Sequence, residues 1–290
     1  MKKQYIYALI SILMWSTTAT TVKLLLGNLN SMQILFFGSV FAFVFLFIVN
    51  LFKGNLKEIK TYKFVDYLQI AIIGLFGTFF YKLFLYLEID KLQASQAFVI
   101  NYLWPIMTVV FAFIILKEKM TFRKIIAIIL SFIGVIIVTS DGNLFNIEKS
   151  TAIGALLCIL AAVSYGLHSV LNKKKSYDKF VSMMLFYFFT IIVSLVYILI
   201  TKTWFTPNLP QTLGLLWNGV FTSAIAYTTW ALALRDGDTA KISNLAYITP
   251  FLSLIWTGLI LKEKWSAYTI IGLIVIVSGI FIQLGKKETE

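Results

Sequence analysis

The sequence has few charged residues, a single histidine and a single cysteine. Charged residues make up 13% of the 290 positions, whereas 59% are hydrophobic and the mean hydropathy is +0.87. Water cannot cover so much apolar surface but lipid can, so the composition excludes an ordinary soluble domain and indicates an integral membrane protein. Because Cys158 has no second cysteine to pair with, an intrachain disulfide is excluded as well.

The groups that catalysis or metal binding needs are also missing. The sequence shows no cluster of cysteine and histidine, no paired carboxylates inside an apolar run, no phosphate-binding glycine loop and no Ser-His-Asp spacing. An intramembrane enzyme should show clustered nucleophile, base or metal ligands. We therefore expect the protein not to be an enzyme and to bind no metal or cofactor.

The formal net charge of +12 raises the question of a nucleic-acid partner. Such a partner would need a continuous basic face, whereas the basic residues of this chain lie in short loops between apolar segments. With both termini in the cytoplasm, 18 lysines and arginines fall in inner segments and 5 in outer loops. This positive-inside bias predicts a multi-pass protein of the bacterial inner membrane, with cytoplasmic N- and C-termini and no nucleic-acid partner.

The apolar segments are long enough to span a bilayer, which takes roughly 20 mainly apolar residues. The fold class that we predict is therefore an all-α integral membrane protein with ten transmembrane helices. Short loops separate these helices, and no soluble domain is left over. The predicted spans are 4–26, 31–52, 64–87, 92–116, 122–140, 151–172, 180–201, 211–234, 239–261 and 266–284.

The stretch from Asn101 to Lys119 nearly recurs 145 residues further along the chain. The shift places Tyr102 on Tyr247, Pro105 on Pro250, and the sequence Lys-Glu-Lys at 117–119 on the same sequence at 262–264. A shift of half the chain length indicates duplication, with one repeat at 1–145 and the other at 146–290. Each repeat holds five helices, an odd number, so the second repeat enters the membrane inverted. Inverted repeats around a central cavity are typical of secondary transporters.

The two prolines interrupt the fourth and ninth predicted helices. Each removes a backbone hydrogen bond and frees a carbonyl one turn earlier, and such a defect survives in a membrane only beside protein or a watery cavity. We predict that Pro105 and Pro250 are hinges for alternating access. Four polar side chains just before them are predicted to bind substrate: Asn101, Tyr102, Asn244 and Tyr247.

Other helices carry polar and aromatic side chains at helical spacing, and we include them in the candidate site. Each has a purely structural alternative, because hydroxyls pack helices, a membrane histidine often bonds a neighbouring helix, and aromatic stripes fill cores. Lys82 could meet a substrate carboxylate or pair with Glu88 or Asp90. The remaining candidates are Trp15, Ser16, Thr20, Tyr81, Ser164, His168, Tyr227 and Trp230. His168 is also the candidate for proton coupling.

These motifs resemble the ten-helix family of the drug/metabolite transporter superfamily that has two EamA repeats. The resemblance covers nearly the whole chain, and its carriers are Trp15-Ser16 with Lys23 and the stretches 94–119 and 239–264, each with its proline and terminal glutamate. The segments 13–17, 101–105, 226–230 and 247–250 are similar to the aromatic amino acid exporter branch. The match departs at Ser164, where that branch tends to have an aromatic residue, and at His168.

The resemblance implies a cavity lined by predicted helices 1, 3, 4, 6, 8 and 9, with helices 5 and 10 at the periphery. It also implies export of amino acids or related metabolites. We expect a monomeric secondary carrier, embedded in the lipid bilayer, for a small aromatic or apolar substrate. The alternative is a carrier of the same fold for another cargo, such as a vitamin, a nucleotide-like metabolite or a cationic drug. The shortage of membrane carboxylates argues against a cation.

Overall fold

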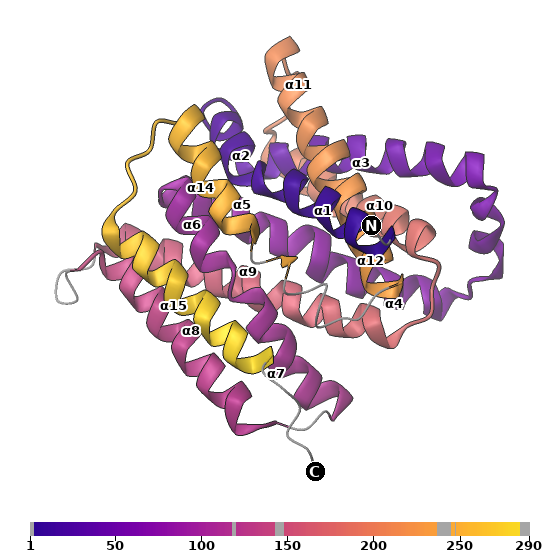
Figure 1. Cartoon of the computed structure of the whole chain (residues 1–290). Coiled ribbons are helices and arrows are strands. Elements are labelled where there is room, and N and C mark those ends of the chain that lie inside the picture. The colour runs from indigo at the N-terminus through magenta and orange to yellow at the C-terminus, as the bar shows by residue number, and fades with distance from the viewer. Residues whose placement is uncertain (1–2, 118–119, 143–147, 237–244, 247, 285–290) are drawn as a thin grey trace.

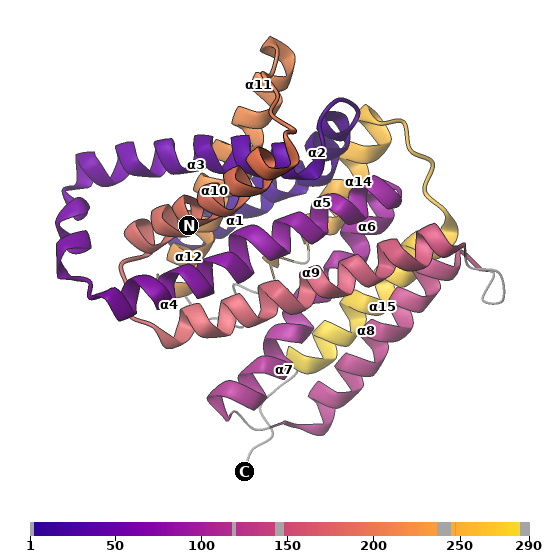
Figure 2. The ribbon, with the colours of Figure 1, turned by 180° about the vertical axis from the view of Figure 1, so that it is seen from behind.

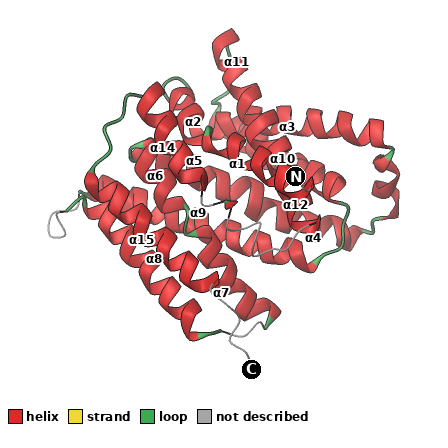
Figure 3. Ribbon diagram, viewed as in Figure 1, coloured by secondary structure: helices red, strands yellow, loops and turns green. Residues whose placement is uncertain are grey.

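The computed structural model describes residues 3–117, 120–142, 148–236, 245–246 and 248–284. Every element formed by these residues is a helix (Figure 3), which confirms the all-α prediction. Seven helical segments in the described part of the chain are long and apolar enough to cross a membrane by length and composition. They are Lys3–Leu26, Ser31–Lys53, Phe64–Lys91, Ala94–Leu116, Phe122–Ser140, Lys149–Lys174 and Lys179–Thr201.

Several of these segments are built from more than one element (Figure 1). The first seven elements are α1 (Lys3–Ser16), α2 (Thr18–Leu26), α3 (Ser31–Lys53), the 3-10 helix η1 (Asn55–Thr61), α4 (Phe64–Gly74), the π-helix η2 (Leu75–Phe80) and α5 (Tyr81–Lys91). They are followed by α6 (Ala94–Asn101), α7 (Trp104–Leu116), α8 (Phe122–Ser140), α9 (Lys149–Lys174) and α10 (Lys179–Thr201). The last five are α11 (Leu209–Leu216), the π-helix η3 (Trp217–Ile225), α12 (Ala226–Asp236), α14 (Ile248–Ile260) and α15 (Ala267–Leu284).

Local sequence accounts for where the helices begin and end. Asn30 and Asn208 each accept a hydrogen bond from the backbone three residues later, and the glutamine at that position bonds back, which forms a capping box. At the other end, α7 stops at Lys117 with a φ of 55°, and α14 is followed by Lys262 with a φ of 57°. A left-handed residue ends a helix. The duplicated Lys-Glu-Lys sequences therefore begin at equivalent helix ends.

The third predicted helix is longer than its sequence pattern suggests. The predicted helix ends at residue 87, whereas α5 continues through Glu88, Asp90 and Lys91. The backbone amide of Leu92 donates to the Glu88 carbonyl, and the Glu88 side chain is fully buried. The charged residues therefore belong to the helix, and one of them points into the protein.

Close helix packing places α8 against α15, and Figures 1 and 2 both show the two helices side by side. Glycine makes this contact possible. A Cβ on Gly134 would stand 2.5 Å from a side-chain atom of Ile276, and one on Gly279 would stand 2.9 Å from the carbonyl oxygen of Ala127. These two glycines are 145 residues apart, so both copies of the repeated sequence contribute to the same contact. The pair lies at the edge of the molecule, as the resemblance implied.

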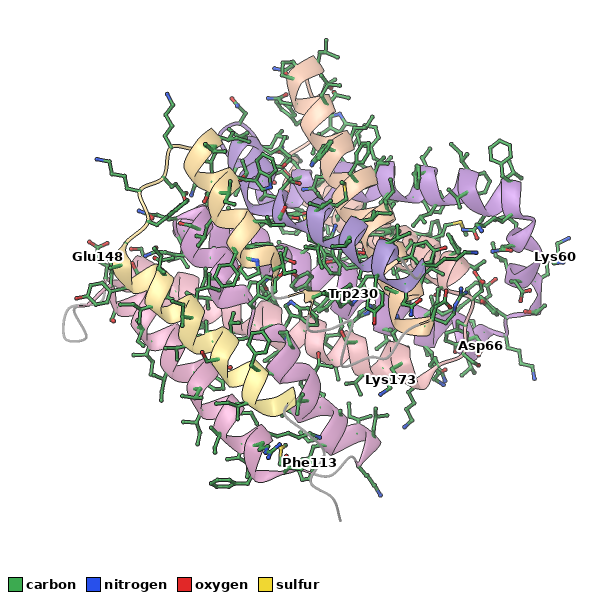
Figure 4. The ribbon with its side chains drawn as sticks, in the orientation of Figure 1. Lys60, Asp66, Phe113, Glu148, Lys173 and Trp230 are labelled. Atoms are coloured by element: carbon green, nitrogen blue, oxygen red, sulfur yellow. The ribbon has the colours of Figure 1, made fainter. Side chains whose placement is uncertain are left out.

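The middle of the molecule is formed by α1, α5, α6, α9, η3 and α12. Figure 4 shows Trp230 there, whereas Lys60, Asp66 and Lys173 lie toward one side and Glu148 toward the opposite side. Large apolar side chains fill this core, and apolar residues such as Phe52, Leu199 and Leu259 are exposed on the outside. An apolar exterior of this kind is suited to lipid.

Candidate functional site

A small cavity lies in the core where residues from both halves of the chain meet. Its volume is about 30 Å³, room for about two water molecules. It is lined by Trp15, Thr18, Tyr81, Lys82, Leu85, Tyr86, Phe98, Asn101, Tyr102, Trp104, Tyr165, Thr222 and Tyr227. These side chains come from α1, α2, α5, α6, α7, α9, η3 and α12, which correspond to predicted helices 1, 3, 4, 6 and 8.

Two π-helical turns position the walls of this cavity. The turn η2 comes directly before Tyr81 and Lys82, and η3 carries Thr222 and comes directly before Tyr227. A π turn inserts one residue into the helix and redirects the side chains that follow, and such turns are frequent at functional sites. Moving η2 by 145 residues places it at 220–225, inside η3, so the same distortion occurs in both copies.

Lys82 is the one charged residue among the lining side chains that the structure describes, and it is 6% exposed. Its Nζ donates to Ser223 Oγ in η3 and lies 5.3 Å and 5.4 Å from the ring centroids of Tyr187 and Tyr227. The ion pairs considered from the sequence are not formed, because Asp90 pairs with Lys91 at 3.1 Å and Glu88 lies beyond ion-pair distance. The described contacts therefore exclude the ion pair with Glu88 or Asp90, and contact with a substrate carboxylate is the alternative that remains for Lys82.

Aromatic rings surround the cavity. Trp15 contacts Tyr227 edge-on at 5.4 Å and Trp230 at 5.3 Å. Tyr165 lies at the centre of the group, 4.7 Å from Tyr81 and 5.9 Å from Tyr227. Such offset and edge-on pairs are the favoured arrangements of aromatic side chains. Trp230 packs behind Trp15 and is not among the lining residues.

The first proline break occurs where the sequence predicted it. The helix α6 ends at Asn101, Tyr102 forms a turn, and α7 begins at Trp104 with Pro105 in its first turn. A proline in the first turn of a helix costs no helical hydrogen bond, so the loss of a bond that we expected from a proline inside a helix does not occur here. Asn101 Nδ2 donates to the hydroxyl of Tyr81 at 3.0 Å, while Asn101 Oδ1 is buried without a hydrogen-bond partner in the described structure. The break thus presents a free amide oxygen next to Lys82 and the aromatic rings.

The second break is described only in part. Pro250 is buried in the first turn of α14, and the amide of Thr249 donates to the carbonyl of Ala246 at 3.0 Å. Asn244 and Tyr247 lie outside the described residues.

Ser164 and His168 serve the fold in this structure. Ser164 Oγ donates to the carbonyl of Phe76 at 2.8 Å, and His168 Nδ1 lies 2.7 Å from the carbonyl of Ile73. A carbonyl only accepts, so Nδ1 carries the proton and the ring is a donor. Both hydrogen bonds reach carbonyls in or next to η2. The His168 ring packs against Gly77 of η2, where a side chain would leave no room for it. These contacts hold the π turn against α9.

Ser16 and Thr20 lie away from the cavity. Ser16 Oγ donates to the carbonyl of Leu13 and accepts from Trp256 Nε1 at 3.0 Å. Thr20 borders a second, wider hollow of about 710 Å³ between α1, α2, α11 and α14. Thr17 lies in the same hollow and accepts a hydrogen bond from Trp217 Nε1 at 2.9 Å. The hollow therefore reaches the junction between α1 and α2. Trp15, which lines the cavity, lies at the same junction.

Two charged side chains hold the turn between α5 and α6. Lys23 Nζ donates to the carbonyls of Ile89 and Leu92 at 2.6 Å and 2.9 Å. The carboxylate of Glu263 accepts from the amides of Ala94 and Ser95 at 2.8 Å and 3.0 Å. A cation thus binds the C-terminus of α5 and an anion binds the N-terminus of α6, as the helix dipoles favour. We call these four hydrogen bonds the α5–α6 clamp.

Sequence reasoning missed several residues at these sites. Tyr165 and Trp104 line the cavity, and Trp104 stands 5.1 Å from Tyr165. The resemblance had pointed to an aromatic residue near position 164, and Tyr165 is the next residue in the chain. Glu263 looked like part of a turn, because a hydrogen bond to a distant helix start leaves no local pattern.

Comparison with known proteins gives a consistent result. A model of the EamA-like transporter family matches residues 2–140 and again residues 152–285. The chain is 28% identical to an uncharacterized transporter of Clostridium kluyveri, over 99% of this chain and 95% of that protein. It is 22% identical to an uncharacterized transporter of Archaeoglobus fulgidus, over 99% of both chains, and 24% identical to the uncharacterized transporter YoaV of Bacillus subtilis, over 93% and 92%.

A solved structure shows the same fold. A crystal structure 20% identical in sequence superposes with a TM-score of 0.71 and covers 97% of this chain and 96% of its own. The names of the relatives and the two family matches indicate a multi-pass membrane transporter of a small molecule. The chain belongs to the EamA-like transporter family.

Proposed function

We propose that the protein is a secondary transporter of the bacterial plasma membrane that exports aromatic or apolar amino acids, or closely related metabolites. The observation that carries the proposal is Lys82, a buried lysine inside a ring of aromatic side chains. An ionised lysine in an apolar interior is costly unless an anion accompanies it. The carboxylate of an amino acid would supply that anion.

The other lining groups suit the remaining parts of such a substrate. Asn101 Oδ1 is buried and unpartnered, so it can accept a hydrogen bond from an ammonium group. Trp15, Tyr165 and Tyr227 offer ring faces and edges to an apolar or aromatic side chain. The described lining residues include no carboxylate, which argues against a cationic drug as the cargo. A nucleotide-like or vitamin anion is the second candidate, since Lys82 favours anions in general.

The architecture that we propose has ten transmembrane helices in two inverted repeats, 1–145 and 146–290. It is supported by the equivalent π turns η2 and η3 and by the equivalent left-handed residues Lys117 and Lys262. We place both termini in the cytoplasm. This orientation agrees with Lys60 and Lys173 lying away from Glu148 in Figure 4. Labelling with an impermeant maleimide, in a Cys158→Ala background so that each variant carries a single cysteine, tests it. Lys202→Cys should react from outside intact cells, and Lys57→Cys should not.

Alternating access is part of the proposal because the described cavity is small. Ligand sites usually measure roughly 300 Å³ or more, so a volume of about 30 Å³ indicates a closed state. In the proposed cycle the halves rock about Pro105 and Pro250, which enlarges the cavity on one side at a time. The wider hollow beside the α1–α2 junction lies next to the cavity and is the route that we propose for opening toward the outside.

Transport by purified protein in proteoliposomes tests the function. Vesicles preloaded with tryptophan should exchange it for labelled tryptophan, and empty vesicles should not. Because Lys82 is assigned to the carboxylate, indole-3-propionate should compete with tryptophan, whereas tryptamine, which lacks a carboxylate, should compete weakly. If phenylalanine, threonine, methionine and tryptophan all fail to exchange, the amino-acid assignment is wrong. Strong competition by tryptamine alone would instead indicate a cation carrier.

A further inference from the structure

Glu88 is a buried carboxyl group that the proposed substrate site does not use. It lies near the end of α5 and its side chain is 0% exposed. Neither of its oxygens has a hydrogen-bond partner in the described structure. On α5 it follows Leu85 by three residues and Tyr81 by seven, and both of these residues line the cavity. Glu88 therefore lies on the cavity-facing side of the helix, one turn beyond the cavity and toward the α5–α6 clamp.

Among the residues that the structure describes, the charged and titratable groups around Glu88 leave it without a counter-ion. Cys158 of α9 adjoins the carboxyl, and its thiol is directed to the carbonyl of Ala97 at 3.8 Å. On α2, Lys23 is engaged by the carbonyls of Ile89 and Leu92. Elsewhere on α5, Lys82 binds Ser223, and Lys91 pairs with Asp90 at the surface.

In the described part of the chain, the other elements packed against α5 add no ionised group at this point. The segment forming α6 has no ionisable side chain, and neither has η2. On α3 the only ionisable residue is Lys53, at the end remote from the clamp residue Lys23, where its ammonium lies over Phe180. On α9, Tyr165 faces the cavity and His168 bonds Ile73.

A carboxylate in such surroundings is neutralised by a proton. Burying an ionised carboxyl without a cation or hydrogen-bond donors costs many kcal/mol, so the group takes a proton from water instead. Surroundings of this kind favour the neutral acid form of the Glu88 side chain.

The position of Glu88 ties that proton to the opening of the clamp. Its own carbonyl accepts from Leu92, its neighbour Ile89 accepts from Lys23, and Ala94 begins the helix held by Glu263. Separating these elements would admit water beside Glu88 and release Lys23 within a few residues of it. Both changes stabilise the carboxylate. The proton can then pass between the carboxyl oxygen and water, with no other reactant.

We propose that Glu88 is a proton-binding site whose protonation is coupled to opening and closing at the α5–α6 clamp. This assignment rests on the proposed transport function for its physiological meaning, but the proton site and its coupling can be measured without any substrate. Protonated Glu88 accompanies the closed clamp, and ionised Glu88 accompanies the open one.

Infrared spectroscopy tests the proton site directly. Protein in lipid nanodiscs at neutral pH should show the carbonyl stretch of a neutral carboxylic acid. The band should be absent from Glu88→Gln, an isostere of the neutral acid, and present in Asp90→Asn, which alters an exposed carboxylate two residues away. Should Glu88→Gln fail to fold, Cys158→Ser provides the second arm, because changing the adjoining thiol should shift the band. A wild-type spectrum without this band overturns the proposal.

The single native cysteine reports on the coupling. Cys158 is buried beside Glu88, so maleimide should reach it only when the clamp opens. The labelling rate of Cys158 should rise with pH more steeply in the wild type and in Asp90→Asn than in Glu88→Gln. In Glu88→Gln the rise reports only the ionisation of the thiol, so this variant is the reference. Identical pH profiles in wild type and Glu88→Gln overturn the coupling. Tryptophan exchange, measured separately, decides the transport function, so the two failures are distinguishable.

Discussion

The segments α4–η2–α5 and α11–η3–α12 share a backbone but differ in their side chains. A shift of 145 residues moves Phe64–Lys91 onto 209–236, and in both segments a π-helical turn leads into an α-helix, α5 or α12, that begins at equivalent positions. The same shift places Lys82 on Tyr227, yet the lysine lies 5.4 Å from the ring of that tyrosine. The two segments therefore form two walls with equivalent backbones, and their different side chains make the space between them asymmetric. One wall contributes a charge and the other an aromatic ring.

Replacing the charge should have the largest effect. Lys82→Met keeps an unbranched side chain but removes the cation, and we expect the binding of an anionic substrate to weaken by about 2–5 kcal/mol. The measurement is tryptophan binding by calorimetry, with Lys57→Met, an exposed lysine, as the control. The double exchange Lys82→Tyr with Tyr227→Lys sharpens the comparison. It should recover part of the binding, because the two positions face each other; no recovery would mean that the walls are not interchangeable.

The π turns differ in how tightly they pack, and this predicts the next largest effect. Gly77 in η2 lies against the His168 ring, whereas the equivalent position in η3 is Thr222, which has a side chain. Gly77→Ala should force this contact apart and lower stability by about 1–3 kcal/mol. The control is Gly214→Ala, whose added Cβ would meet the flexible end of Leu25 at 2.9 Å. Equal melting temperatures for the two variants would contradict the prediction.

His168 should matter for stability and not for pH dependence. Its Nδ1 donates to the carbonyl of Ile73, so His168→Ala leaves a buried carbonyl without its partner and should cost about 1–3 kcal/mol in unfolding. The neighbouring Ser169→Ala removes only a bond within its own helix and serves as the control. The pH profile of transport should be the same in His168→Ala and wild type. A changed profile would assign proton coupling to the histidine and not to Glu88.

The smallest effect is expected at the clamp. Glu263→Gln retains the shape of the side chain but loses its charge at the start of α6, which should cost about 1 kcal/mol. Hydrogen exchange at the amides of Ala94 and Ser95 should quicken, whereas Lys264→Gln, an exposed neighbour, should leave it unchanged. Unaltered exchange in Glu263→Gln would show that the charge does not hold the clamp.

Several features of the site could be predicted from the sequence because they depend on local chemistry. A proline one turn after a polar pair predicts a helix break, and Asn101, Tyr102 and Pro105 form one. Helical spacing placed Tyr81 and Lys82 on a helix with a polar, aromatic face, and the structure brings both to the cavity together with Trp15 and Tyr227. These predictions did not require knowing which helices pack against these residues.

Other features depend on which helix face packs inward, and spacing does not determine that. Ser164 and Tyr165 are adjacent, yet Ser164 bonds the η2 backbone and Tyr165 faces the cavity, because consecutive residues of an α-helix point about 100° apart. Glu88 looked like a loop residue, since charge normally marks the end of a membrane helix. Its burial depends on the contact with α9, which the sequence of α5 does not contain.

The sequence by itself determined that the chain is helical and apolar on the outside, and it predicted two repeats, because these properties depend on composition, on periodicity and on a recurrence that can be counted. Only the tertiary structure decided which polar groups are left unpaired. Whether Lys82, Asn101 and Glu88 find partners depends on atoms contributed by helices far apart in the chain. An unpaired polar group in an apolar interior is costly, and that cost is what a substrate or a proton can relieve.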